Sequence, residues 1–184
     1  MHIGLSQRIL HYKSRAYDSL EHGWYSFLKD HTLYPVPNNT DIDFEAIADA
    51  IDLYIITGGD DSALRRTVEI KMASNMLKRN KPIIGICHGA FLLTDILGGK
   101  VEETMCHSDV LHQVNYFGEQ VWVNSYHNLA ITKPHGKAIV LATDEEQNCE
   151  AWIDGNIAGV VWHPERMDRP WLPDEILDLL KEHT

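Results

Sequence analysis

The chain has 184 residues, of which 44% are hydrophobic and 23% charged, so it is long enough for one folded domain spanning residues 1–184. The net charge is −11 and Lys and Arg form no dense cluster, which argues against a nucleic-acid partner. No stretch approaches the roughly 18 apolar residues of a membrane span, so we expect no membrane partner either.

The three cysteines, Cys87, Cys106 and Cys149, are widely spaced and odd in number. They form no Cys-x-x-Cys pair, which disfavours a disulfide framework and favours a reducing compartment. The N-terminus enters an apolar segment without the basic region of a signal peptide. We therefore expect a cytoplasmic protein.

Strand-like and helix-like segments alternate in the first half of the chain. Apolar, β-prone segments at 2–6, 32–36, 53–57 and 83–86 are predicted as strands. Helices are predicted at 15–30, 43–50, 62–80 and 91–97. This alternation is typical of a parallel, doubly wound sheet.

The second half is dominated by β-prone segments, at 120–125, 138–143, 150–153 and 157–162, before a closing helix at 173–182. Asp154-Gly155-Asn156 is a hairpin turn signal between the last two of these strands. The fold class predicted is therefore α/β, with a mostly parallel central sheet and a smaller antiparallel section in the second half. Residues 102–118 show no clear periodicity and could form an ordinary loop or a lid.

Gly85-Ile86-Cys87-His88-Gly89 lies between the strand at 83–86 and the helix at 91–97. It has the pattern of a nucleophile elbow, with Cys in the place of the usual Ser. The flanking glycines avoid clashes in such a sharp turn, and the positive end of the following helix favours a thiolate. The alternative is that Cys87 is a small hydrophobic residue of the core.

Gly58-Gly59-Asp60-Asp61 follows the strand predicted at 53–57. A glycine pair at this place lets backbone N–H groups face a ligand without interference from side chains. Arg65, Arg66 and Glu69 come near the start of the following helix. Their spacing predicts an Arg65–Glu69 pair on a solvated face of that helix.

His163-Pro164-Glu165 follows the last predicted strand. In an extended segment, residues two apart point to the same side, so His163 and Glu165 are predicted to lie together. A cysteine nucleophile needs a base that takes and returns a proton, and that base needs a carboxylate to orient it. His163 and Glu165 have the residue types for those two roles.

Seven segments in this order resemble the class I glutamine amidotransferase superfamily, and most closely its free-standing γ-glutamyl hydrolase branch. They run from about residue 53 to 166 and are Thr57-Gly58-Gly59-Asp60, Arg66-x-x-Glu69, Pro82 to Gly89, Leu97-Gly98-Gly99, Val123 to His127, Glu150-Ala151 and Gly159 to Glu165.

The resemblance implies a single three-layer domain, with a central sheet flanked by helices, and a triad of Cys87, His163 and Glu165. Cys87 would attack the carbonyl carbon of a γ-glutamyl amide, His163 would transfer the proton, and Glu165 would orient His163. The backbone N–H groups of Gly59 and His88 would bind the oxyanion, and water would hydrolyse the thioester. This implied chemistry needs no metal and no cofactor.

The same resemblance assigns substrate contacts to Gly58, Asp60 and the segment Asn124-Ser125-Tyr126-His127, which is similar to the part that recognises the glutamyl end. The alternative for His127 is an ordinary packed histidine. Phe91 stands where many members have Gln, and Val161 departs from a frequent Gln two residues before the triad His. These departures put hydrolysis of glutamine itself in question.

A looser resemblance, carried by Ser6-Gln7-Arg8 and Tyr25-Ser26-Phe27, is to bacterial γ-glutamyl-CDP-amidate hydrolases of capsule phosphoramidate synthesis. It implies a small-molecule substrate with a diphosphate. Arg8, Arg15, Arg65 or Arg66 could bind such a group bidentately, and Arg8 and Arg66 are the candidates we retain.

Other functions stay open at this point. The chain could be the glutaminase subunit of a two-protein amidotransferase, delivering ammonia to a synthetase partner. It could be a binding module without catalysis, although no triad member is missing, or a cysteine peptidase or chaperone of a related fold. A metal site at His107 and His112 is disfavoured by their spacing. A homodimer is compatible with the sequence.

Overall fold

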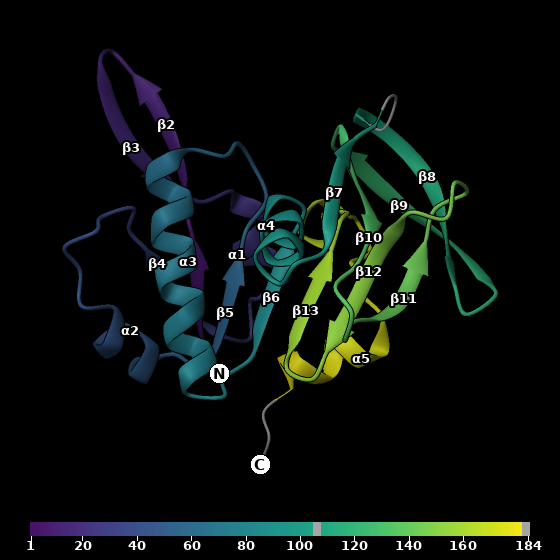
Figure 1. The fold of residues 1–184 in the computed structure, drawn as a ribbon. Helices are drawn as coiled ribbons and strands as arrows, with labels where there is room; N and C mark the ends of the chain where they lie inside the picture. Colours follow the sequence, from purple (N-terminus) through teal and green to yellow (C-terminus); the bar gives the residue numbers. More distant parts are fainter. Residues whose placement is uncertain (105–107, 182–184) are drawn as a thin grey trace.

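The computed structural model describes residues 1–104 and 108–181, and one mixed β-sheet runs through their middle (Figure 1). Its parallel part has the strand order β4-β1-β5-β6-β13. The bounds are β4 (Thr32–Val36), β1 (His2–Ser6), β5 (Leu53–Ile56), β6 (Ile83–Ile86) and β13 (Ile157–Val160). Every residue of β5, β6 and β13 is buried, as expected of parallel strands that are covered on both faces.

The antiparallel part continues the sheet beyond β13 through β12 (Cys149–Asp154), β11 (Ile139–Thr143), β8 (Ser108–Tyr116) and β9 (Glu119–Tyr126). β10 (Leu129–Lys133) pairs with both β12 and β7 (Lys100–Glu103). The predicted α/β fold, with a parallel section followed by an antiparallel section in the second half, is therefore confirmed, but among the described residues the antiparallel section is not the smaller one. The segment 102–118 is mostly β-strand, and not a loop or lid, where it is described; Cys106 and His107 lie outside the described residues.

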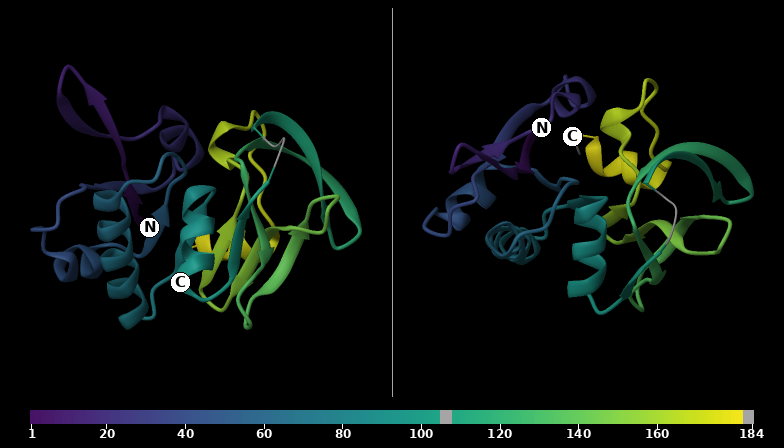
Figure 2. Two further views of the ribbon diagram at one scale, coloured as in Figure 1. Left: turned by 45° about the horizontal axis from the view of Figure 1, so that its top comes forward. Right: turned by 90° about the horizontal axis from the view of Figure 1, so that it is seen from above.

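The helices form two outer layers around the sheet. α3 (Ala63–Lys78) and α4 (His88–Ile96) cover one face, and α1 (His22–Phe27) and α5 (Asp174–Leu177) lie on the other (Figure 2). α2 (Phe44–Ala50) packs beside α3. The closing helix is shorter than predicted, because α5 passes into a 3₁₀ turn, η2 (Asp178–Leu180). The three-layer arrangement itself is confirmed.

The predicted helix over 15–30 is wrong in its first part. β3 (Arg15–Ser19) instead pairs antiparallel with β2 (Arg8–Tyr12), and this hairpin projects from the body of the molecule (Figure 1). Its turn residues, Lys13 and Ser14, both have positive φ (46° and 63°), which matches the twist of a hairpin. Only the second part of the range is helical, where α1 buries Trp24.

Candidate active site

Cys87 occupies the sharp turn between β6 and α4, with φ +50° and ψ −105°. That conformation is strained for a residue with a side chain, and such strain collects at functional sites. A Cβ atom at Gly85 would collide with the backbone of Gly89, and one at Gly89 would collide with the carbonyl of Ile56. The turn therefore requires both glycines, as the sequence predicted.

His163 and Glu165 meet just beyond β13, where Pro164 begins a 3₁₀ turn, η1 (Pro164–Arg166). His163 Nδ1 donates to Glu165 Oε1 at 2.6 Å. The Cys87 side chain lies close enough to the His163 imidazole to raise its pKa, so the three side chains form one row. All three are buried, with Cys87 7% exposed.

The pKa of His163 is raised from 6.5 to about 9. Burial alone would lower it, but hydrogen bonds with Cys87 and Glu165, and the negative charge on both, favour the imidazolium. A proton on His163 at neutral pH allows a thiolate–imidazolium pair with Cys87, which is the reactive form of a cysteine nucleophile.

A cavity of about 550 Å³ opens above this row. It lies at the carboxyl ends of the parallel strands, where open α/β sheets keep their ligands. The predicted site residues that line it are Arg8, Gly59, Asp60, Arg66, Cys87, His88, Tyr126, His127 and His163. Phe91 also lines it and makes an edge-to-face contact with His127, with ring centroids 5.8 Å apart.

Gly58, Asn124 and Ser125 were predicted to contact substrate, but they lie behind the wall of the cavity. Gly58 packs so closely on the His163 imidazole that a Cβ atom there would overlap the ring. Asn124 holds the backbone of His163 through two hydrogen bonds of 2.8 Å each. Gly58 and Asn124 therefore fix where His163 sits.

Two further residues were not singled out from the sequence: Arg166, which lines the cavity, and Glu21, which binds Arg166. Arg166 binds Glu21 through Nη2–Oε2 and Nε–Oε1 contacts of 2.8 and 3.0 Å, and its guanidinium lies 4.7 Å from the centre of the Tyr126 ring. Arg8 Nη2 reaches the same carboxylate at 3.4 Å, and Arg8 Nε donates to the Gly58 carbonyl at 3.0 Å. We call Arg8, Glu21 and Arg166 the mouth cluster.

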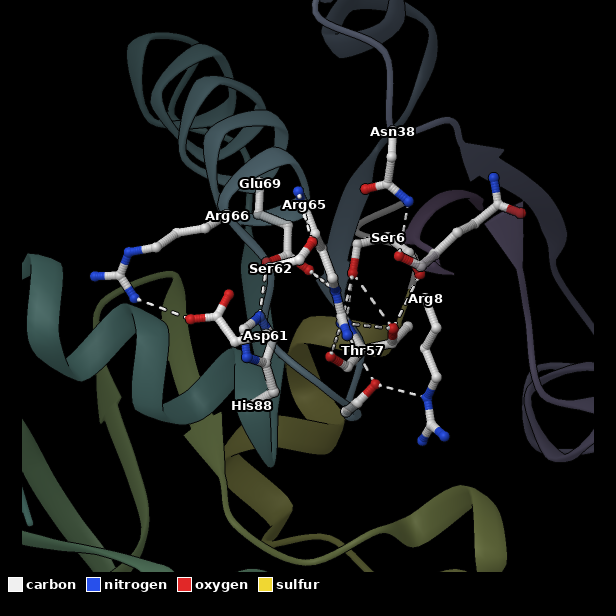
Figure 3. A network of polar contacts seen from close by, with 12 residues as sticks. Ser6, Arg8, Asn38, Thr57, Asp61, Ser62, Arg65, Arg66, Glu69 and His88 are labelled. Carbon is white, nitrogen blue, oxygen red and sulfur yellow. Dashed lines mark hydrogen bonds and ion pairs between the residues drawn. The ribbon is translucent and has the colours of Figure 1, made fainter. Parts of the chain in front are cut away.

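Arg65 and Glu69 form a pair on α3 (Figure 3). The predicted solvated face is wrong, because both side chains are completely buried. Arg65 Nε donates to Glu69 Oε1 at 2.7 Å, and Glu69 Oε2 lies 2.7 Å from His88 Nε2. Arg65 is thus not accessible to a substrate diphosphate. Arg15 lies on the projecting hairpin, outside the lining of the cavity.

No group of three His, Cys, Asp or Glu side chains within residues 1–104 and 108–181 is arranged to hold a metal ion. The His107 half of the disfavoured His107–His112 metal site lies outside that range. Among the helices described, none is both long enough and apolar enough to cross a membrane.

The comparisons with known proteins agree on one family. The family model of class-I glutamine amidotransferases matches residues 13–179. A Campylobacter jejuni protein named gamma-glutamyl-CDP-amidate hydrolase is 28% identical over 183 residues, which cover 90% of each chain. The pyridoxal 5′-phosphate synthase subunit PdxT of Actinobacillus pleuropneumoniae is 26% identical over 148 residues, 72% of this chain and 78% of that protein.

Solved structures show the same fold. A Thermoplasma acidophilum protein described as a GMP synthase subunit superposes with a TM-score of 0.74 at 16% identity, over 97% of this chain and 91% of that one. A glutamine amidotransferase from Thermotoga maritima gives a TM-score of 0.68 at 17% identity, over 89% of this chain and 76% of that one.

Proposed function

The chain belongs to the class-I glutamine amidotransferase family, and from this premise we propose that it is a cysteine-dependent hydrolase of a γ-glutamyl C–N bond in a small molecule. The observation that carries the proposal is the row of Cys87, His163 and Glu165, of which Cys87 and His163 line the cavity. A strained nucleophile, a protonated imidazole and an orienting carboxylate are the parts that acyl transfer from an amide needs.

In the proposed reaction, the Cys87 sulfur attacks the γ-carbonyl carbon and the carbonyl oxygen becomes an oxyanion. The N–H groups of Gly59 and His88 are the donors proposed for that oxygen. The C–N bond then breaks, His163 gives its proton to the leaving nitrogen, and an amine departs. Water, deprotonated by His163, attacks the γ-glutamyl thioester, which releases glutamate and restores the thiol.

The mouth cluster supports an anionic leaving group. Two guanidinium groups share one carboxylate there, so the cluster keeps one excess positive charge. Arg66, which is paired with Asp95, lies in the wall of the same cavity. Guanidinium groups bind phosphate oxygens bidentately. We propose a γ-glutamyl nucleotide amidate as the substrate, such as the γ-glutamyl-CDP-amidate named for the Campylobacter relative. The role that we propose in capsule synthesis rests on the resemblance carried by Ser6-Gln7-Arg8 and Tyr25-Ser26-Phe27.

A second candidate is the glutaminase subunit of a two-protein amidotransferase. It is supported by the similarity to PdxT, whose name describes a synthase subunit. This function predicts slow glutamine hydrolysis by the chain alone and faster hydrolysis with a synthetase partner. Phe91 in the cavity wall weighs against it, because an aromatic ring offers no hydrogen bond to a glutamine substrate.

The test is glutamate release by the purified chain from glutamine, from neutral γ-glutamyl amines and from a γ-glutamyl nucleotide amidate. Cys87→Ala should abolish release, whereas Cys149→Ala, which alters a buried free cysteine in β12, should retain it. Turnover of the amidate alone supports the proposed function. Slow turnover of glutamine alone, or equal activity of Cys87→Ala, contradicts it.

A further inference from the structure

The two backbone N–H groups proposed for the oxyanion come from different elements. Gly59 lies in the loop after β5, and His88 is the first residue of α4. Two donors stabilise one oxygen only if their separation is held close to the productive value, because errors near 1 Å are costly. Something must therefore fix the glycine loop relative to the elbow.

Arg65 binds the backbone of the glycine loop from the interior of the protein. Its Nη2 donates to the Thr57 carbonyl at 2.5 Å and its Nη1 donates to the Asp60 carbonyl at 3.0 Å. Thr57 precedes the glycine pair and Asp60 follows it, so one planar guanidinium binds the loop on both sides of Gly59. Figure 3 shows Arg65 beside Thr57. Because the guanidinium is planar and rigid, it fixes the positions of the two carbonyl groups relative to each other.

Glu69 connects Arg65 to His88, which lies in the sharp turn that carries Cys87. One carboxylate oxygen accepts from Arg65 Nε and the other bonds the ring of His88, both at 2.7 Å. Burial alone would raise the pKa of Glu69, but the hydrogen bond from His88 and the charge of Arg65 lower it instead. Glu69 is therefore ionised, and its charged hydrogen bonds are stronger than neutral ones.

We propose that Arg65 and Glu69 are positioning residues, which tie the glycine loop to the His88 ring and so hold the Gly59 and His88 N–H groups at one fixed separation. The inference rests on the proposed hydrolase function. Neither side chain lines the cavity, so neither contacts the substrate. Their effect is on the rate of the chemical step and not on binding.

The His88 side chain gives the sharpest test, because its replacement leaves both backbone donors in place. His88→Leu fills the space but cannot bond Glu69, whereas His88→Gln places an amide N–H near the position of Nε2. We expect His88→Leu to lower kcat about 10- to 100-fold with KM changed less than about twofold, and His88→Gln to keep most of the activity.

Alkylation of Cys87 by iodoacetamide separates positioning from general damage, because that reaction forms no oxyanion. His88→Leu should be alkylated at the wild-type rate across pH. Asp49→Asn serves as a matched control: it breaks an Arg79–Asp49 pair of 2.6 Å on the outer surface and should leave kcat unchanged. Glu69→Gln should lower kcat as His88→Leu does, but the His88 pair carries the test if that variant fails to fold.

Each result has one meaning. Loss of kcat in His88→Leu, with alkylation intact and recovery in His88→Gln, supports the positioning role. Wild-type kcat in His88→Leu, or equal loss in the Leu and Gln variants, overturns it while the hydrolase function stands. If the wild-type chain releases no glutamate from any compound, the proposed function fails and this inference falls with it.

Discussion

Two Arg–Glu clusters flank the glycine loop, and they differ mainly in burial. In the inner cluster of Arg65, Glu69 and His88, the Arg65 and Glu69 side chains are 0% exposed. In the mouth cluster, the side chains of Arg8, Glu21 and Arg166 are 30%, 34% and 19% exposed. The clusters meet at the Gly58 carbonyl, which lies 3.0 Å from Arg8 Nε and 3.4 Å from Arg65 Nη2.

The difference shows how the same residue types take different roles. Every guanidinium nitrogen of Arg65 is bonded to protein, as a buried charge requires. The Nη1 atoms of Arg8 and Arg166 make no hydrogen bond within the described residues, so they remain available to an anion at the cavity entrance. We therefore infer that the inner cluster positions the glycine loop, and that the mouth cluster binds an anionic group of the substrate.

The largest expected effect is on stability. Glu69→Gln leaves the buried Arg65 charge unpaired and should lower the free energy of unfolding by about 3–5 kcal/mol. Glu21→Gln breaks the half-exposed contacts of the mouth cluster and should cost less than about 1 kcal/mol. Urea unfolding of the two matched variants measures both. Equal losses would remove the distinction between the clusters.

The next effect is on substrate binding. Arg166→Ala and Arg8→Ala should each raise KM for a γ-glutamyl nucleotide amidate by about 10- to 100-fold, because each removes charge-assisted bonds worth about 1.5–3 kcal/mol. KM for a neutral γ-glutamyl amine should stay unchanged. Steady-state kinetics with both substrates, and Arg79→Met as a surface control, decide this. A parallel rise for both substrates contradicts an anion site.

A pH titration examines His163, whose imidazole packs against Gly58. The pKa of His163 is raised to about 9, so glutamate release should fall as the pH passes through about 9 and His163 loses its proton. A raised folded pKa stabilises the fold below the unfolded value of 6.5, and this stability is lost as the pH rises to about 9. The loss amounts to at most about 3 kcal/mol.

Glu165→Gln is the matched variant for that titration. It removes the carboxylate charge that favours the imidazolium, so the alkaline fall in activity should move to lower pH. Unfolding measurements over the same pH range should show a smaller loss of stability. If the fall in activity at high pH occurs at the same pH in this variant, a group other than His163 causes that fall.

The smallest effect concerns salt. Raising the ionic strength from about 50 to about 500 mM should increase KM for the amidate a few-fold, because the half-exposed mouth cluster is screened. The inner cluster is shielded from solvent, so kcat and the relative stabilities should hardly move. In a variant with both Arg8→Ala and Arg166→Ala, the salt dependence of KM should become much weaker, and an unchanged salt dependence would place the anion site elsewhere.

Much of the parallel half could be predicted from the sequence, because its strands are short apolar runs bounded by glycines or prolines. Residues 15–30 were misassigned because Lys13-Ser14 carries none of the usual hairpin turn residues, although it adopts that conformation. The strand β8 was missed because its exposed residues, such as Leu111, break the alternation of apolar and polar positions.

In the site, Cys87, His163 and Glu165 could be found because each stands in a short local pattern. Arg166 and Glu21 could not be paired, since 145 positions separate them and no local spacing connects them. The spacing of Arg65 and Glu69 predicted their contact correctly, but the spacing of residues in a sequence does not show how deeply their side chains are buried. Their burial follows from the packing of α3 against the glycine loop, which only the tertiary structure shows.

The central claim is that Cys87 forms a γ-glutamyl thioester. The most direct measurement is the intact mass of the chain after rapid acid quench during turnover of the γ-glutamyl nucleotide amidate. We predict a mass gain equal to one γ-glutamyl group, located on the peptide that contains Cys87 and absent from Cys87→Ala. Turnover without any adduct, or an adduct on Cys149 instead, would contradict the account.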